Sequence, residues 1–85
     1  MLIIDRPLNG GTQKVYKFEN GYGASVIEGG TYTYGAEEGL QELAVLKFKE
    51  AGDYSLCYDT EITDDVLGYL TEQDVKDLLE RIENL

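Results

Sequence analysis

The residues with the clearest potential for chemistry are four carboxylates within the seven-residue stretch DTEITDD, namely Asp59, Glu61, Asp64 and Asp65. Hard cations such as Ca²⁺ prefer carboxylate oxygens, so a metal site is one interpretation. The stretch lacks the central glycine and the distal bidentate glutamate of an EF-hand loop. We therefore expect no metal ligands here, and we interpret the four acids as part of a charged surface.

Nucleophilic and acid–base catalysis has few of its usual side chains in this chain. It has one cysteine, Cys57, and no histidine, which excludes Ser-His and Cys-His dyads and imidazole metal ligands. One cysteine cannot form an intramolecular disulfide, which fits a reducing cytosol. No cation lies beside Cys57 in YSLCYD to activate its thiol, so a buried apolar role is predicted. We expect no enzyme activity and no cofactor.

The charge is acidic and unevenly distributed. The 85 residues carry 17 Asp and Glu against 7 Lys and Arg, a formal net charge of −10. Residues 1–58 hold 8 acids and 5 bases, and residues 59–85 hold 9 acids and 2 bases. Such a surface repels nucleic acid and attracts basic proteins. The alternative is an ordinary solvated helix face, with acids placed near helix starts.

Tyrosine is the other enriched residue type, with seven copies and no tryptophan. Tyrosine rings on an open sheet face suit an interface, because they offer contact area and a hydroxyl at low entropy cost. The alternative is that the rings fill a small core. The candidate partner-binding residues are Asp59, Glu61, Asp64, Asp65, Glu72, Tyr32 and Tyr34.

The first two thirds of the chain have the alternation and turn signals of antiparallel strands. Asn9-Gly10 and Asn20-Gly21 are hairpin turns by sequence, and Pro7 is expected to stop the first strand. Residues 40–50 form the strongest strand, apolar on both faces in its first half, which is typical of a central strand. The other expected strands are residues 2–5, 13–19, 22–28, 31–34 and 54–59.

The last third is predicted to be helical. Thr71 is a suitable N-cap with Asp74 completing a capping box. An apolar stripe at helical spacing follows, made of Val75, Leu78, Leu79, Ile82 and Leu85.

Two further helical features are expected on either side of Thr71. A single turn capped by Thr63 is expected to include Val66, Leu67 and Leu70. The i,i+4 pairs Lys76–Glu80 and Asp77–Arg81 are expected to add weak ion pairs.

These elements predict an α+β fold in which one amphipathic C-terminal helix packs on one face of a curved antiparallel sheet of four to six strands. Residues 1–85 are expected to form a single domain, with a β-sheet region over 1–59 and a helical region over 60–85. No apolar run reaches the ~20 residues of a membrane helix, and the N-terminal residues lack signal-peptide features. We therefore expect a cytoplasmic protein without membrane contact.

The segments NGYGASVI, TYTYGAEEGLQELAVLKF and YDTEITDDVLGYLTEQDVKDLLERI resemble a group of small uncharacterised proteins of bacteriophages and prophages. The resemblance covers the chain from about Gln13 to its end. It implies a phage setting in the host cytoplasm and no catalytic residues. Small acidic phage proteins are often accessory factors that bind host proteins, and some mimic the charge of DNA to block restriction or CRISPR effectors.

The sequence thus leads to the hypothesis of a non-enzymatic accessory protein that binds a basic protein partner. The binding surface is either the acidic C-terminal region or the Tyr-rich sheet, and one specific form is inhibition of a host DNA-binding defence enzyme by a DNA-like surface. The alternative is a virion or morphogenesis component that self-associates. We expect a monomer or homodimer without direct nucleic-acid binding.

Overall fold

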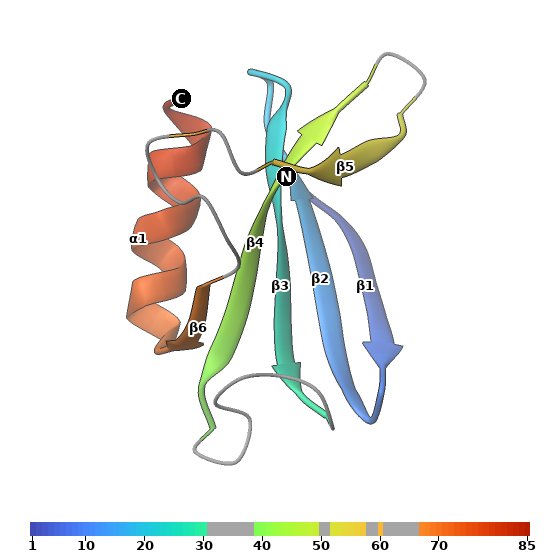
Figure 1. Cartoon of the computed structure of the whole chain (residues 1–85), viewed down its shortest axis with the longest axis vertical. Helices are drawn as coiled ribbons and strands as arrows, with labels where there is room; N and C mark the ends of the chain where they lie inside the picture. Colours follow the sequence, from blue (N-terminus) through green and yellow to red (C-terminus); the bar gives the residue numbers. More distant parts are fainter. Residues whose placement is uncertain (31–38, 50–51, 58–59, 61–66) are drawn as a thin grey trace.

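The fold is described by a computed structural model that covers residues 1–30, 39–49, 52–57, 60 and 67–85. One antiparallel sheet, which does not close into a barrel, carries α1 on one face (Figure 1). This arrangement confirms the expected α+β fold. The elements are β1 (Leu2–Leu8), β2 (Gly11–Lys17), β3 (Tyr22–Gly29), β4 (Gln41–Phe48), β5 (Tyr54–Leu56), β6 (Leu67–Leu70) and α1 (Glu72–Glu83).

Two short strands share the far edge of β4. The sheet order is β1-β2-β3-β4-β5, with β6 also paired to β4. Leu56 of β5 is opposite Leu46, and Leu67 of β6 is opposite Leu43. Between them the Cys57 amide donates to the Val45 carbonyl oxygen at 2.8 Å. Cys57 and Leu67 are therefore both anchored on this edge, and β4 is central as predicted.

The β1–β2 hairpin confirms the predicted turn but not the predicted end of the strand. Asn9 (φ 50°) and Gly10 (φ 84°) both lie in the left-handed region that a two-residue hairpin loop requires. β1 nevertheless runs through Pro7 to Leu8. Leu8 and Gly11 are paired at the two ends of the loop, where a two-residue hairpin has a hydrogen-bonded pair. Because such pairs alternate with non-hydrogen-bonded ones, the backbone nitrogen of Pro7 points away from β2, at the sheet edge, where no N–H donor is needed. Proline is tolerated there, and the expectation that it stops the strand was wrong.

The helical turn expected around Leu67 and Leu70 is replaced by β6. These two residues pair with β4, and Tyr69 between them has φ 56°, which no right-handed helix accepts. The predicted helical region over residues 60–85 therefore contains a strand. The predicted cap Thr63 and Val66 of the same turn lie outside the described residues, as does the strand expected over residues 31–34.

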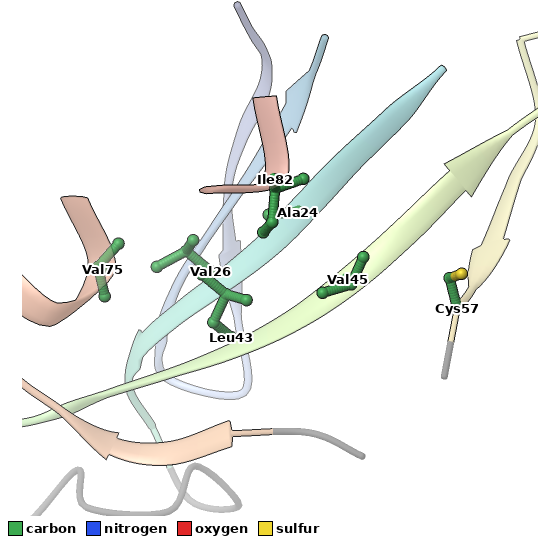
Figure 2. Close-up of a cluster of buried hydrophobic side chains, with 7 residues drawn as sticks. All are labelled: Ala24, Val26, Leu43, Val45, Cys57, Val75 and Ile82. Carbon is green, nitrogen blue, oxygen red and sulfur yellow. The ribbon is translucent and has the colours of Figure 1, made fainter. Parts of the chain in front are cut away.

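The main core lies between α1 and the sheet. Val75 and Ile82 of α1 point toward Ala24 and Val26 on β3 (Figure 2). Leu78, Leu79 and Leu85 are only half-buried but pack against the same core, which confirms the predicted stripe. Its buried residues are Ala24, Val26, Leu43, Val45, Cys57, Val75 and Ile82.

A smaller core lies on the opposite face of the sheet. Val15, Leu46 and Phe48 are buried there. The Phe48 ring lies 5.3 Å from the Tyr54 ring, between centroids, and passes over Gly23, where an added Cβ would meet a ring carbon at 2.6 Å. β4 is thus packed on both faces: Leu43 and Val45 belong to the main core, and Leu46 and Phe48 belong to the smaller core.

Candidate interaction surface

The N-terminal end of α1 is fixed by the predicted capping box. The Asp74 amide donates to Thr71 Oγ1 at 3.1 Å, and the Thr71 amide donates to Asp74 Oδ2 at 3.0 Å. The bond from the Thr71 backbone, and then the bond from its side chain, hold the pKa of Asp74 below its ordinary value of 3.8. Asp74 therefore stays ionised at neutral pH.

The outward side of α1 is mainly acidic, with five acids and the two bases Lys76 and Arg81. Its acids are exposed, while Val75 and Ile82 on the inner side are buried. The predicted Lys76–Glu80 and Asp77–Arg81 ion pairs do not form within the described helix, and Asp77 instead accepts from Gln73 Nε2 at 3.0 Å. We call the exposed acids Glu72, Asp74, Asp77, Glu80 and Glu83 the helix acids.

A groove runs beside this surface between α1 and β2, because α1 packs mainly over β3, β4 and β6. Its floor includes Tyr16 and Val26, and Leu79 lies along the helix side. The charged side chains around the groove come from both layers and form no ion pair with one another in the described chain. They are Lys14, Glu28, Glu72 and Lys76.

Only one of the seven predicted partner-binding residues falls within the described part of the chain. Glu72 is the first residue of α1, exposed, and at the edge of the groove. The other six lie outside the described residues: Tyr32, Tyr34, Asp59, Glu61, Asp64 and Asp65. The segment that holds the last four begins and ends on the β4 edge, next to the strand that leads into α1.

The described tyrosines divide between core and surface. Tyr16 and Tyr22 are half-buried against the main core, and the Tyr22 ring lies 4.0 Å from Lys47 Nζ. Tyr54 and Tyr69 are exposed, the latter by 60%. They lie on the separate strands β5 and β6, so the described tyrosines form no single Tyr-rich sheet face.

Two features of the described surface were missed by sequence reasoning. Tyr69 combines high exposure with a left-handed backbone, and no sequence signal indicates that conformation. Arg6 is held by the side chain of Gln13. Spacing places these two residues on facing strands but does not reveal the contact.

The described residues contain no group of three or more His, Cys, Asp or Glu side chains placed to hold a metal ion. None of the helices in that part of the chain has the length and apolar character of a membrane span.

No family model, curated protein or solved structure matches this chain. The resemblance to phage and prophage proteins therefore stays a prediction.

Proposed function

We propose that this protein acts without catalysis by binding a basic partner protein through the helix acids. The observation that carries the proposal is the packing of α1, which holds five acids outward on a docked helix while Val75 and Ile82 anchor its other side. No ion pair with another described residue neutralises these acids. A fixed, unpaired set of like charges attracts a surface of opposite charge.

The expected partner has a cluster of Lys and Arg side chains. Lys76 and Arg81 leave α1 with a charge of −3, from five acids and two bases, within a chain of net charge −10. Complementary charge mainly accelerates association and excludes acidic partners. Binding should therefore weaken steeply as ionic strength rises, because salt shortens the Debye length to about 8 Å at physiological concentration.

A DNA-binding host enzyme is the specific partner class that follows from the phage resemblance. Its basic cleft accepts phosphates, and exposed carboxylates on a rigid helix present a similar field of negative charge. A competition experiment distinguishes binding in the DNA-binding cleft of such an enzyme from binding to a basic protein at some other surface. The protein should displace duplex DNA from such an enzyme, and added DNA should release the protein.

The test compares two variants with the same change in charge. Asp77 and Glu80 are replaced by Lys on α1, and Asp5 on β1 and Asp53 beside β5, exposed acids away from the helix, are replaced by Lys in the control. Each is used to capture the partner across a salt series. The helix variant should bind more than about tenfold less tightly, and the control much less so. Equal losses would assign the effect to net charge and contradict a specific helix surface.

A further variant addresses the acids outside the described residues. Replacing Asp64, Asp65 and Glu72 by Lys is expected to leave the fold intact, since Glu72 is exposed. It should also reduce partner binding, mostly by slowing association at low salt. Undiminished binding would mean that Asp64, Asp65 and Glu72 do not contribute and that the partner-binding surface consists of the helix acids after Glu72.

Self-association is the alternative function, and the N-terminal residues favour it. Met1, Leu2 and Ile3 are exposed by 80%, 44% and 43% at the edge of the sheet. Burying apolar side chains against a second copy is insensitive to salt, unlike the proposed charged contact. Light scattering at low and high salt distinguishes the two. A dimer or larger assembly that persists at high salt and is lost on Ile3→Lys would favour this alternative.

A further inference from the structure

A chain of side-chain hydrogen bonds crosses three strands on the sheet face opposite α1. Arg6 Nε on β1 donates to Gln13 Oε1 on β2 at 2.8 Å, and Gln13 Nε2 donates to Ser25 Oγ on β3 at 2.8 Å. Arginine can only donate, so Gln13 must present its oxygen to Arg6 and its amide nitrogen to Ser25. The orientation of the Gln13 amide is thus set by chemistry.

The inner part of this chain is rigid because it is buried. Gln13 is 8% exposed and Ser25 is 7% exposed. Arg6 lies at the exposed end, on the edge strand. Gln13 therefore orients the plane of the Arg6 guanidinium and uses only one of its five N–H donors. The four N–H groups on the two terminal guanidinium nitrogens are not used by Gln13 and can donate to a ligand.

Arg6 has no acidic partner among the described residues, which include ten of the chain's 17 acids. Within that part of the chain its side chain donates to Gln13 and forms no ion pair. Glu42 on β4 lies on the same face of the sheet as Arg6, since cross-strand pairs connect Arg6 to Gln13, Gln13 to Ile27, and Ile27 to Glu42. Three strand spacings separate Arg6 from Glu42, which is about 14 Å. Asp5 is adjacent in sequence and points to the other face.

We propose that Arg6 is an anion-binding residue whose ligand is an oxoanion, a carboxylate or phosphate group on a bound molecule. The planar guanidinium forms two parallel hydrogen bonds with such a group. Because Gln13 already restricts the rotamers of Arg6, this side chain loses less conformational entropy on binding a ligand than an arginine without such a hydrogen bond would. The site lies on the opposite face of the sheet from α1, so it is separate from the helix acids.

The chain contains its own reference for this proposal. Its second arginine, Arg81, is exposed on α1, and among the described residues no side-chain hydrogen bond holds its guanidinium. In ¹⁵N-labelled protein, the two arginine Nε–H signals are followed during titrations with sodium phosphate and with sodium acetate. Sodium chloride at matched ionic strength is the control. The two titrations distinguish a phosphate ligand from a carboxylate ligand.

The expected result is a saturable shift of the Arg6 signal and of the Gln13 side-chain amide, with little response from Arg81. Arg6→Lys keeps the charge but loses the planar fork, so the apparent affinity should fall about tenfold. Arg81→Lys should leave it unchanged. Gln13→Glu should also weaken binding, since a carboxylate beside Arg6 would take the place of the ligand.

Two outcomes would overturn the proposal. One is an equal response of both arginines to phosphate and acetate, or a response that chloride reproduces, which indicates general screening. The other is parent-like affinity in Arg6→Lys. This variant changes an exposed side chain on an edge strand and so decides the question even if Gln13→Glu does not fold.

Discussion

Asn20 Nδ2 lies 2.9 Å from the Ile82 carbonyl oxygen, which ties the β2–β3 turn to the last turn of α1. The same nitrogen lies 3.1 Å from the Glu83 carbonyl oxygen and 3.3 Å from that of Leu85. Asn20 Oδ1 accepts from the Tyr22 amide at 3.0 Å, which fixes the side chain in place. The final carbonyls of a helix lack partners within the helix, and here a turn more than 60 residues earlier in the chain supplies them.

Removing this contact should loosen the helix end. Asn20→Ala is expected to lower the free energy of unfolding by about 1–2 kcal/mol, because it removes the side-chain donor that the oxygens of Ile82, Glu83 and Leu85 share. Asn84→Ala is the matched control, since Asn84 donates to the Glu80 carbonyl at the exposed end of α1. It should cost no more than about 0.5 kcal/mol. Urea unfolding measures both, and equal losses would contradict the role of Asn20.

Core substitutions on α1 should follow burial rather than residue size. Ile82 is fully buried against the sheet, whereas Leu78 is half-buried. Ile82→Ala is expected to destabilise the fold by about 2–4 kcal/mol, and Leu78→Ala by a smaller amount. Thermal unfolding of both variants tests this order. Parent-like melting of Ile82→Ala would mean that α1 is not docked on the sheet.

The capping box should make stability depend on pH in the acid range. The pKa of Asp74 is lowered in the folded state, so the stabilisation it provides is complete above its unfolded pKa of about 3.9. It is lost as the pH falls through the folded value. Asp74→Asn should therefore melt below the parent at pH 7, and the difference should shrink below about pH 4. A difference that does not change with pH would exclude this ionic contribution.

The acids of the DTEITDD stretch should need no metal. Its spacing does not match a calcium loop. The melting temperature should be the same in EDTA and in excess Ca²⁺ or Mg²⁺. An increase of many degrees with near-stoichiometric Ca²⁺ would instead identify Asp59, Glu61, Asp64 and Asp65 as ligands, because a ligand that binds only the folded state stabilises it.

The features that could be predicted from the sequence depend on neighbours in the chain. Asn9-Gly10 satisfies the loop geometry by itself, and Thr71 caps α1 with a residue three positions away. The position of α1 on the sheet followed from its apolar stripe. These signals require no knowledge of which strands pair.

The errors concern features that depend on pairing. Pro7 is accepted within β1 because that strand is an edge, and β6 exists because β4 has a free side to pair with. The contact between Arg6 and Gln13 likewise depends on the β1–β2 register and on side-chain reach. Single-residue propensities carry none of this information.

The shared edge of β4 has a consequence for how this chain can change in length. Cys57 and Leu67 are anchored opposite Val45 and Leu43, two residues apart on one strand, so their anchor points lie roughly 7 Å from each other. Nine residues connect them. Each doubling of the length between two anchored residues adds only about 0.6 kcal/mol of closure entropy. Versions of this chain lengthened between Cys57 and Leu67 should therefore keep the same sheet and the same helix.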